Sequence, residues 1–355
     1  MAKRSASPPA AGKASREEAP PDHESPVECP ATSQEAGSGM VGPCDEAYFE
    51  AYGQLDIHAL MLRDHQRVSC YLAAIRLNKA SIQNRLVLDV GAGSGILAML
   101  AAKHGGAKHV YAVEAVPSMA SLARRLVQRN GLETQVTVLE GRIEDVELPS
   151  QMDVIISEWM GFYLVHESML ESVLHARDRW LKPQGLLLPS SARILAAPVE
   201  AEELRAELEG YGDLHGLDLS FVGEERLASQ MSEPQVETVE PRRLLGEPVL
   251  AFDLGDLHKL PAGSTREFKA KLTFTTWRPG RAAGIAFWFD VGFSGEGSSV
   301  TLKTDPGSPS THWQQTVVYL GVFAAVDAGD ILEAEVTMRQ SESNPRQYDI
   351  SIETQ

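Results

Sequence analysis

The fold is decided by VLDVGAGSGIL, residues 87–97, where three glycines join a short apolar run to a helical pattern. The run over residues 85–90 is typical of a strand buried on both faces of a parallel sheet. Gly91, Gly93 and Gly95 allow the chain to turn with positive φ and let its backbone approach a ligand closely. In a doubly wound sheet such a turn lies at the carboxyl ends of the strands, where ligands bind.

Acidic residues on either side of the turn favour one class of ligand. The spacing is GxGxG, whereas dinucleotide-binding turns read GxGxxG and direct amides at a pyrophosphate. Asp89 precedes the first glycine by two positions, where a carboxylate suits an ammonium or sulfonium charge better than a diphosphate. Glu114 ends the next predicted strand and can accept hydrogen bonds from ribose hydroxyls. The pattern predicts S-adenosylmethionine as cofactor in preference to NAD.

Strand and helix patterns alternate around this turn. Helical patterns cover residues 95–105, 118–131 and 167–185, and apolar runs that predict strands cover 109–115, 135–141 and 152–158. Apolar residues at helical spacing between 47 and 77 predict one or two amphipathic helices before the first strand. The alternation predicts an α/β domain over residues 45–189, with a doubly wound, Rossmann-like sheet.

Different patterns occupy the two ends of the chain. Short runs rich in Val, Phe, Trp and Thr recur at 250–254, 267–277, 284–293, 316–321 and 331–338. With a polar helical stretch ahead of them, they predict an antiparallel β domain over 190–355, a barrel or a sandwich. Residues 1–44 are rich in Pro, Ala, Ser and Glu, which predicts a disordered tail.

Composition narrows the function. The formal net charge of −17 argues against nucleic acid as a partner, because phosphate binding requires a basic surface, and it favours cationic partners such as Arg-rich peptides. No apolar run approaches the roughly 20 residues that span a bilayer, so no membrane partner is expected. Cys29, Cys44 and Cys70 form no disulfide or zinc framework, which predicts no metal and a reducing intracellular compartment.

Two glutamates follow the fourth predicted strand, in SEWMGFYLVHESML, residues 157–170. Glu158 stands at the carboxyl end of the strand, and Glu167 follows nine residues later at the predicted start of a helix. Two carboxylates above a cofactor can clamp a planar guanidinium. Each also has a structural explanation, since Glu158 can pair with a nearby arginine and Glu167 can favour a helix N-terminus.

This segment resembles the double-glutamate loop of type I protein arginine methyltransferases, and further segments resemble the same family in the same order. They are YFEAY (48–52) with DIHALMLRDHQR (56–67), VLDVGAGSG (87–95), VYAVEA (110–115) and STHWQQTVVYL (310–320). The resemblance implies methyl transfer from S-adenosylmethionine to arginine in proteins, giving mono- and asymmetric dimethylarginine. Residues 157–192 are most similar to the branch numbered six, nuclear enzymes that methylate histones, which implies a nuclear location and histone substrates.

The resemblance also implies site residues. The cofactor would be held by His58, Arg67, Asp89, Gly91, Gly93, Gly95, Glu114, Ile143 and Glu144, with Arg67 on its carboxylate and Ile143 and Glu144 beside its adenine. Glu158 and Glu167 would grip the guanidinium, and the substrate pocket would be completed by Tyr48, Tyr52, Met61, Met169 and Trp313. The proton would pass to His312, paired with Asp64, or to Glu167.

Some positions depart from the family pattern. Ala59 and Leu60 stand where the family has two acidic residues, and residues 200–232, which align with its helical dimerisation arm, lack the expected aromatic pair. A homodimer is therefore expected on an altered arm. Three alternatives remain open: a methyltransferase of small molecules or RNA, a cofactor-binding regulator with weak activity and, more distantly, a dinucleotide-dependent dehydrogenase.

Overall fold

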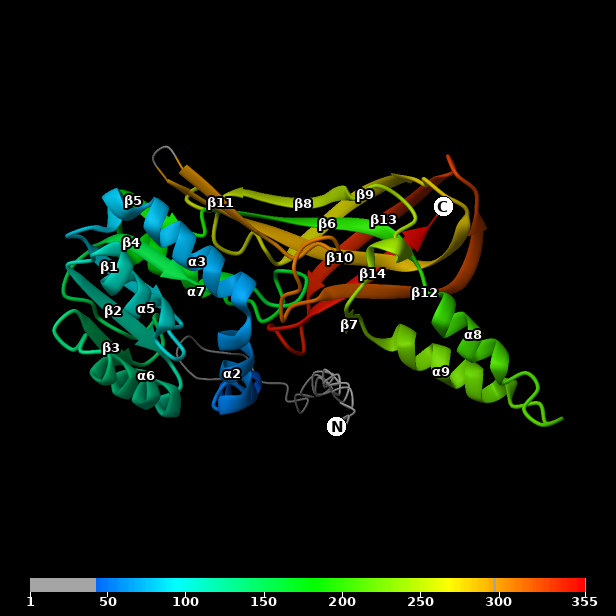
Figure 1. The fold of residues 1–355 in the computed structure, drawn as a ribbon, viewed down its shortest axis with the longest axis horizontal. Helices are drawn as coiled ribbons and strands as arrows, with labels where there is room; N and C mark the ends of the chain where they lie inside the picture. The colour runs from blue at the N-terminus through cyan, green and yellow to red at the C-terminus, as the bar shows by residue number, and fades with distance from the viewer. Residues whose placement is uncertain (1–42, 296–297, 355) are drawn as a thin grey trace, which may run out of the picture.

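Two domains lie side by side, one built on a parallel sheet and one on antiparallel strands from which a pair of helices projects (Figure 1). The structure is a computed structural model and describes residues 43–295 and 298–354. The tail predicted over residues 1–44 lies outside the described residues, apart from its last two positions, which begin the first helix.

A series of helices precedes the parallel sheet. They are α1 (Pro43–Ala51), α2 (Leu55–Arg63), α3 (His65–Leu77) and α4 (Lys79–Ile82). Asp64 separates α2 from α3, because its carboxylate accepts a hydrogen bond from the Arg67 N–H at 2.9 Å and caps α3. Tyr71 and Ile75 of α3 are fully buried, so this helix packs into the core.

The parallel sheet has five strands in the order β3-β2-β1-β4-β5. Its strands are β1 (Leu86–Val90), β2 (His109–Glu114), β3 (Val136–Glu140), β4 (Met152–Ser157) and β5 (Leu181–Leu188). The strand order reverses at the central β1, which pairs with β2 on one side and β4 on the other. The crevice at the carboxyl ends of these strands is the position where ligands bind in such sheets.

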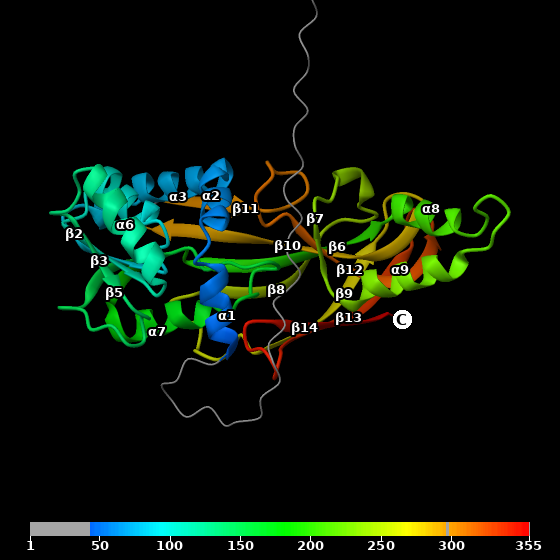
Figure 2. The same cartoon turned by 90° about the horizontal axis from the view of Figure 1, so that it is seen from below.

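Helices cover both faces of this sheet, which confirms the predicted doubly wound α/β domain. They are α5 (Ile96–Leu100), continued by the π-helical turn η1 (Ala101–Gly105), α6 (Pro117–Arg129) and α7 (Leu170–Trp180). Figure 2 shows α6 and α7 on opposite sides of the sheet.

The helix predicted over residues 167–185 is shorter at both ends. Glu167 and Ser168 have positive φ angles of 74° and 56°, which a right-handed helix excludes, so α7 begins only at Leu170. Its predicted last turn instead forms β5 despite Pro183, since an edge strand tolerates a residue without an amide hydrogen.

The C-terminal half confirms the predicted antiparallel β domain. One sheet contains β6 (Ser191–Glu200), β7 (Gln235–Glu237), β8 (Val249–Asp256), β10 (Gly280–Gly295), β11 (Ser298–Lys303) and β12 (Gln315–Val326). The other contains β9 (Glu267–Thr275), β13 (Ile331–Gln340) and β14 (Tyr348–Thr354), and its edge strand β9 lies next to β8. Strands β6, β11 and β14 were not predicted.

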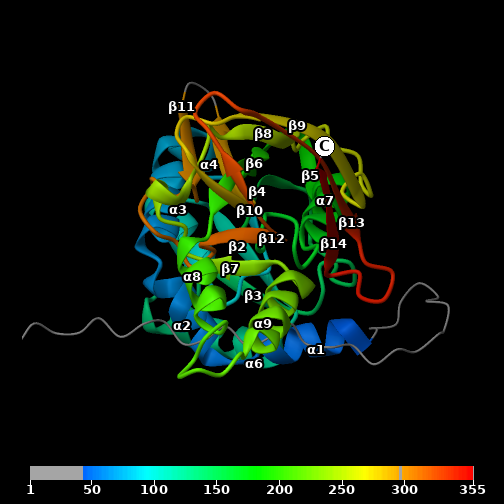
Figure 3. The same ribbon diagram turned by 90° about the vertical axis from the view of Figure 1, so that its right-hand side faces the viewer.

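The predicted helical stretch forms a pair of helices, α8 (Glu202–Gly210) and α9 (Ser220–Ser232). The two helices pack on each other, and α9 contacts β12 (Figure 3). A short 3₁₀ turn, η2 (Pro241–Arg243), leads from β7 toward β8. Within the part of the chain that the structure describes, no helix is long and apolar enough to cross a membrane.

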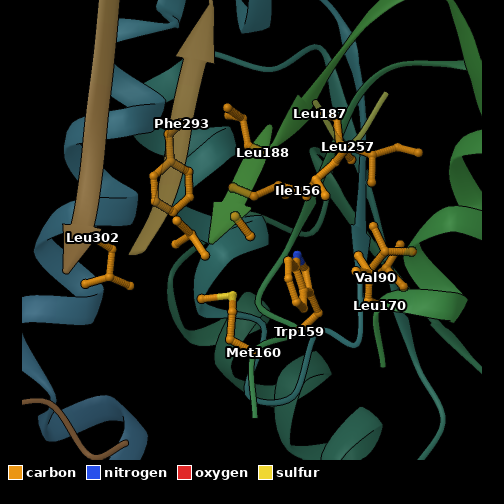
Figure 4. Close-up of a cluster of buried hydrophobic side chains, with 14 of the residues drawn as sticks. Val90, Ile156, Trp159, Met160, Leu170, Leu187, Leu188, Leu257, Phe293 and Leu302 are labelled. Atoms are coloured by element: carbon orange, nitrogen blue, oxygen red, sulfur yellow. The ribbon is translucent and has the colours of Figure 1, made fainter. Parts of the chain in front are cut away.

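One hydrophobic core extends across both domains. Its members include Val90, Ile156 and Leu188 from the parallel strands, Phe293 and Leu302 from β10 and β11, and Trp159 and Met160 from the double-glutamate loop (Figure 4). Trp159 and Met160 are 2% and 4% exposed. The loop that carries the two glutamates is therefore anchored in the core directly after Glu158.

Candidate active site

The glycine turn lies at the carboxyl end of β1. Gly91, Gly93 and Gly95 have φ angles of 69°, 53° and 77°, which side-chain-bearing residues rarely adopt. A Cβ atom on Gly91 would lie 2.1 Å from the Met169 Cε, and one on Gly93 would lie 3.2 Å from the His58 Cε1. The turn therefore requires glycine for both conformation and space. Two predicted site residues, Met169 and His58, lie close to it.

Two buried carboxylates support this turn. Glu114 accepts hydrogen bonds from the N–H groups of Gly93 at 2.6 Å and Val116 at 2.8 Å. Its pKa is raised by burial, although these hydrogen bonds oppose the rise. The carboxylate of Asp89 accepts from the Ala98 N–H at 2.9 Å, and burial raises the pKa of Asp89 to about 7.

These contacts refine the roles expected for the two acids. A carboxylate has about four acceptor positions, so Glu114 can still bind ligand hydroxyls. Asp89 is fully buried and holds the start of α5 from beneath the turn, so its direct contact with a cationic ligand stays a prediction. Its Oδ1 has no hydrogen-bond partner among the described residues. An open acceptor set beside a side-chain-free turn fits a hydroxylated, positively charged ligand such as S-adenosylmethionine.

Ile143 and Glu144 follow β3 in the loop toward β4. Ile143 is buried, and the Glu144 carboxylate accepts a hydrogen bond from the Ser172 hydroxyl of α7 at 2.7 Å. His58 is also buried, and its ring lies 2.9 Å from the Tyr52 carbonyl. Across residues 43–295 and 298–354, no cluster of His, Cys, Asp or Glu has the arrangement of a metal site.

Glu158 forms an ion pair with Arg67 directly after β4. Its Oε2 lies 2.8 Å from one terminal nitrogen of Arg67, and the two side chains are 9% and 7% exposed. Arg67 also donates to the Met61 carbonyl at 3.1 Å. This ion pair is the structural role that a nearby arginine can give Glu158. In this structure it engages Arg67, the residue expected to bind the carboxylate of the cofactor. The Oε1 of Glu158 accepts a 3.2 Å bond from the Met160 N–H, so it retains capacity to bind a cation.

Glu167 lies under two tyrosines of the N-terminal segment. Its Oε2 accepts a hydrogen bond from the Tyr52 hydroxyl at 2.8 Å, and the rings of Tyr48 and Tyr52 pack with centroids 4.7 Å apart. Removal of its carboxylate from water, together with the nearby charge of Glu158, raises the pKa of Glu167 to about 7. Glu167 therefore changes its charge near neutral pH.

The loop before β12 brings His312 and Trp313 to the same place. The Asp64 Oδ2 lies 2.7 Å from the His312 Nδ1 and also accepts the His312 backbone N–H at 2.9 Å. Burial opposes these hydrogen bonds, which together with that from Arg67 lower the pKa of Asp64. Trp313 donates to the Met160 carbonyl at 2.8 Å and is 3% exposed, so it supports the double-glutamate loop from below.

Two residues of this arrangement were not predicted, Arg346 and Asp45. Arg346 donates from Nε to Asp45 at 2.8 Å and from a terminal nitrogen to the Glu167 carbonyl at 2.9 Å. The ion pair joins positions 301 residues apart, so no local pattern marks it. The predicted residues otherwise converge on one edge of the sheet, from α1, α2, the glycine turn, the double-glutamate loop and the loop before β12.

Comparison with known proteins covers both domains. Residues 87–185 match the family described as methyltransferase domain, and residues 190–355 match the arginine methyltransferase oligomerization subdomain. Protein arginine N-methyltransferase 6 of Xenopus tropicalis is 39% identical over 85% of this chain and 89% of its own. A probable protein arginine N-methyltransferase 6 of Arabidopsis thaliana is 36% identical over 90% of this chain and 82% of its own.

Solved structures of related proteins show the same architecture. Protein arginine methyltransferase 10 of Arabidopsis thaliana has a TM-score of 0.77 at 35% identity, covering 86% of this chain and 94% of its own. A Trypanosoma brucei arginine methyltransferase enzyme–prozyme heterotetramer, solved with AdoHcy, has a TM-score of 0.78 at 31% identity and the same coverage. The chain therefore belongs to the protein arginine N-methyltransferase family, and it methylates arginine in proteins with S-adenosylmethionine as methyl donor.

Proposed function

We propose that Glu158 and Glu167 together bind the substrate guanidinium, and that the chain is a type I enzyme that makes mono- and asymmetric dimethylarginine. One observation carries the proposal: Glu158 directly follows β4, Glu167 lies in the same loop near enough to feel the charge of Glu158, and each retains capacity to accept further hydrogen bonds. The same loop reaches the glycine turn through Met169. Planar guanidinium groups are bound most strongly by carboxylates that accept several N–H bonds at once.

The two carboxylates answer the main chemical obstacle to the reaction. Arginine stays protonated far above neutral pH, because its pKa is the highest of the basic side chains, and it spreads its charge over three nitrogens, which makes each nitrogen a poor nucleophile. When bound, S-adenosylmethionine supplies an electrophilic methyl group. Glu158 and Glu167 draw the positive charge toward the nitrogens they face and leave the remaining nitrogen richer in electrons. Fixing that nitrogen in line can contribute about 7–11 kcal/mol to the barrier reduction.

The residues that would hold the cofactor are those around the glycine turn. Glu114 offers free acceptor positions to ribose hydroxyls, and His58 packs against Gly93. Arg67 pairs with Glu158 inside the site, and it would also bind the carboxylate of the cofactor. Asp89 lies buried beneath the turn, and its Oδ1 has no hydrogen-bond partner in the part of the chain that the structure describes.

The methylated nitrogen must lose a proton, and two groups are candidates to accept it. His312 is oriented by the ionised Asp64, an arrangement in which a base is held by a carboxylate. Glu167 is the other candidate, but pairing with a substrate cation would lower its pKa and make it a weaker base. This contrast supports His312 as the acceptor.

Met169 bears on the product. It follows Glu167 by two residues, and its Cε lies where a Gly91 side chain would project. A bulky side chain at this point would restrict the space around the acceptor nitrogens. Met61 lies on α2, and its main-chain carbonyl accepts a hydrogen bond from Arg67, the partner of Glu158. Both support asymmetric dimethylation. Mass spectrometry that found symmetric dimethylarginine would contradict this part of the proposal.

We also propose a homodimer formed through α8 and α9, with arginine-rich nuclear proteins such as histones as substrates. Leu217 and Phe221, between and on these helices, are 63% and 67% exposed, an apolar surface that a second subunit can cover. The match to the oligomerization subdomain supports the dimer, and the nuclear location rests on the resemblance of residues 157–192 to the branch numbered six.

The proposal is tested by incubating the protein with labelled S-adenosylmethionine and either histone H3 or RNA. We expect label only in the histone, on arginine, as asymmetric dimethylarginine by mass spectrometry. Incorporation into RNA would favour a non-protein acceptor. Tight binding of the cofactor without transfer to histones or other Arg-rich proteins would favour a regulatory homologue.

A further inference from the structure

The segment 341–347, between β13 and β14, crosses from the β domain to the double-glutamate loop. Its Pro345 carbonyl accepts hydrogen bonds from the Ser168 hydroxyl at 2.6 Å and from the Gln340 amide at 2.6 Å. Gln340 in turn donates to the Ser168 hydroxyl at 3.1 Å. This segment is therefore bonded directly to the residue that follows Glu167.

The main chain of Glu167 both donates a hydrogen bond to Arg346 and accepts one from it. The Glu167 N–H donates to the Arg346 carbonyl at 2.6 Å, and the Arg346 side chain donates to the Glu167 carbonyl at 2.9 Å. Both peptide groups of Glu167 are thus held by one residue of the other domain.

The backbone that these bonds hold is strained. Glu167 and Ser168 are consecutive non-glycine residues with positive φ, at 74° and 56°. Such residues persist only where surrounding contacts over-determine them, and they are concentrated at functional sites. Without the bonds from Arg346, the loop would relax toward ordinary φ angles and turn the Glu167 carboxylate away from its present direction.

The Arg346 guanidinium also holds the helix above the site. It bonds to Asp45 of α1 at 2.8 Å and 2.6 Å, and it lies 3.8 Å from the ring centroid of Tyr48. Tyr48 in turn packs on Tyr52, which donates to the Glu167 carboxylate. Arg346 therefore contacts both the main chain of Glu167 and the helix whose tyrosines enclose it.

We propose that Arg346 is a positioning residue, which aims the Glu167 carboxylate at the substrate and fastens α1 over it. This inference rests on the proposed role of Glu167. It assigns to the β domain a direct part in forming the guanidinium site, in addition to its His312 loop. Arg346 acts through Glu167 and α1 and does not need to touch the substrate.

A second consequence concerns the charge of Glu167. The groups that face its carboxylate are Tyr48 and Tyr52 from the N-terminal segment, Glu158 from the loop after β4, and Arg346 from segment 341–347. Of these, Arg346 carries the positive charge that favours the ionised form. Removal of this charge raises the pKa of Glu167, so the pH below which substrate binding is lost moves upward.

The test compares Arg346→Met, Arg346→Lys and Arg339→Met in the full chain, with a histone H3 peptide as substrate. Methionine keeps an apolar side chain over Tyr48 but removes the charge and the guanidinium hydrogen bonds to Asp45 and the Glu167 carbonyl, and lysine restores the charge with fewer donors. The main-chain bond from the Glu167 N–H to the carbonyl at position 346 is present in all three proteins. Arg339 is the matched control, because its guanidinium pairs with Glu267 of the same β domain, whereas that of Arg346 bonds to Asp45 and the Glu167 carbonyl. The readouts are kcat, KM, the pH profile of kcat/KM, affinity for S-adenosylhomocysteine and Tm.

We expect Arg346→Met to lower kcat/KM by roughly 10- to 100-fold, as for a misplaced catalytic group. Its affinity for S-adenosylhomocysteine should match wild type, and the acidic limb of its profile should move to higher pH. Arg346→Lys should recover part of the loss, and Arg339→Met should behave as wild type. Unchanged kinetics in Arg346→Met, an unshifted acidic limb, or an equal loss in Arg339→Met would overturn the proposal.

Wild type and Glu167→Gln, measured in the same series, separate this inference from the proposed function. If wild type methylates the peptide and Glu167→Gln does not, normal activity in Arg346→Met refutes only the positioning role. If Glu167→Gln is itself active, the clamp fails and the positioning role fails with it.

Discussion

The glycine turn and the double-glutamate loop lie at the same edge of the parallel sheet, but different contacts hold them. The turn is held within the first domain, and its Gly93 N–H bonds to Glu114, 21 positions away. The double-glutamate loop is held by Arg67, Trp313 and Arg346, whose bonds to it span 91, 153 and 179 positions. Its geometry therefore depends on the N-terminal helices and the β domain at once.

This difference separates two functions of the site. The turn and its acids can form whenever the parallel sheet folds, so binding of the cofactor is a property of one domain. Binding of the guanidinium requires all the segments that meet on the double-glutamate loop. Substitutions in the loop should therefore leave the affinity for the cofactor unchanged, whereas substitutions in the turn should lower that affinity.

The largest effect is expected from the two glutamates. Glu158→Gln and Glu167→Gln keep the shape of each side chain but remove the charge that orients the guanidinium, so methyl transfer should fall on the order of 1,000-fold. Transfer to a histone H3 peptide measures this. Glu171→Gln is the matched control, since its carboxylate bonds to Gly263 and Thr265, whereas those of Glu158 and Glu167 bond to Arg67 and Tyr52. Near-normal transfer in either site variant would refute the clamp.

His312→Gln tests whether the β domain supplies the base. General base catalysis contributes typically 10²- to 10⁴-fold, so kcat should fall roughly 100-fold while KM changes little. His258→Gln is the control, because that histidine also pairs with an aspartate, Asp256, at a distance from the site. A normal kcat in His312→Gln would transfer the role of proton acceptor to Glu167.

Gly91→Ala tests the glycine turn. A left-handed alanine costs about 1–2 kcal/mol, and its methyl group would displace Met169, so affinity for S-adenosylhomocysteine should fall roughly tenfold by calorimetry. Gly106 has a similar φ of 71°, but a Cβ atom there would meet no atom closer than 3.5 Å. Gly106→Ala should therefore lower the stability of the protein and leave its affinity for S-adenosylhomocysteine unchanged. Equal affinity in both variants would show that the turn does not approach the ligand.

The smallest effect is the pH dependence that Glu167 gives to substrate binding. The clamp requires ionised Glu167, whose pKa of about 7 means that it takes up a proton as the pH falls through neutrality. From pH 7 to pH 6, kcat/KM should drop by up to about tenfold. A flat kcat/KM profile down to pH 6 would contradict the assignment.

The two regions also differ in how far the sequence predicts them. The turn, its acids and the alternation of strands and helices follow from local patterns, because strand, glycines and helix are adjacent in the chain. The position of Glu167 outside α7 was not predicted, since its positive φ is imposed by Arg346, far away in the sequence. The pairing of Glu158 with Arg67 was only one of two readings, because local patterns do not show which arginine reaches a carboxylate.

Strand prediction failed for related physical reasons. Strand β5 contains Pro183, which argues against a strand unless its edge position is known. Strands β11 and β14 are short or polar and are stabilised by their partners β10 and β13. Such elements depend on tertiary pairing more than on their own composition.

The separation of the two regions is tested most directly by the affinity of Glu167→Gln for S-adenosylhomocysteine, measured by calorimetry. The account predicts a dissociation constant within about twofold of wild type, since the glycine turn is held without the double-glutamate loop. A loss of affinity as large as that of Gly91→Ala would contradict it and show that the two regions form a single binding unit.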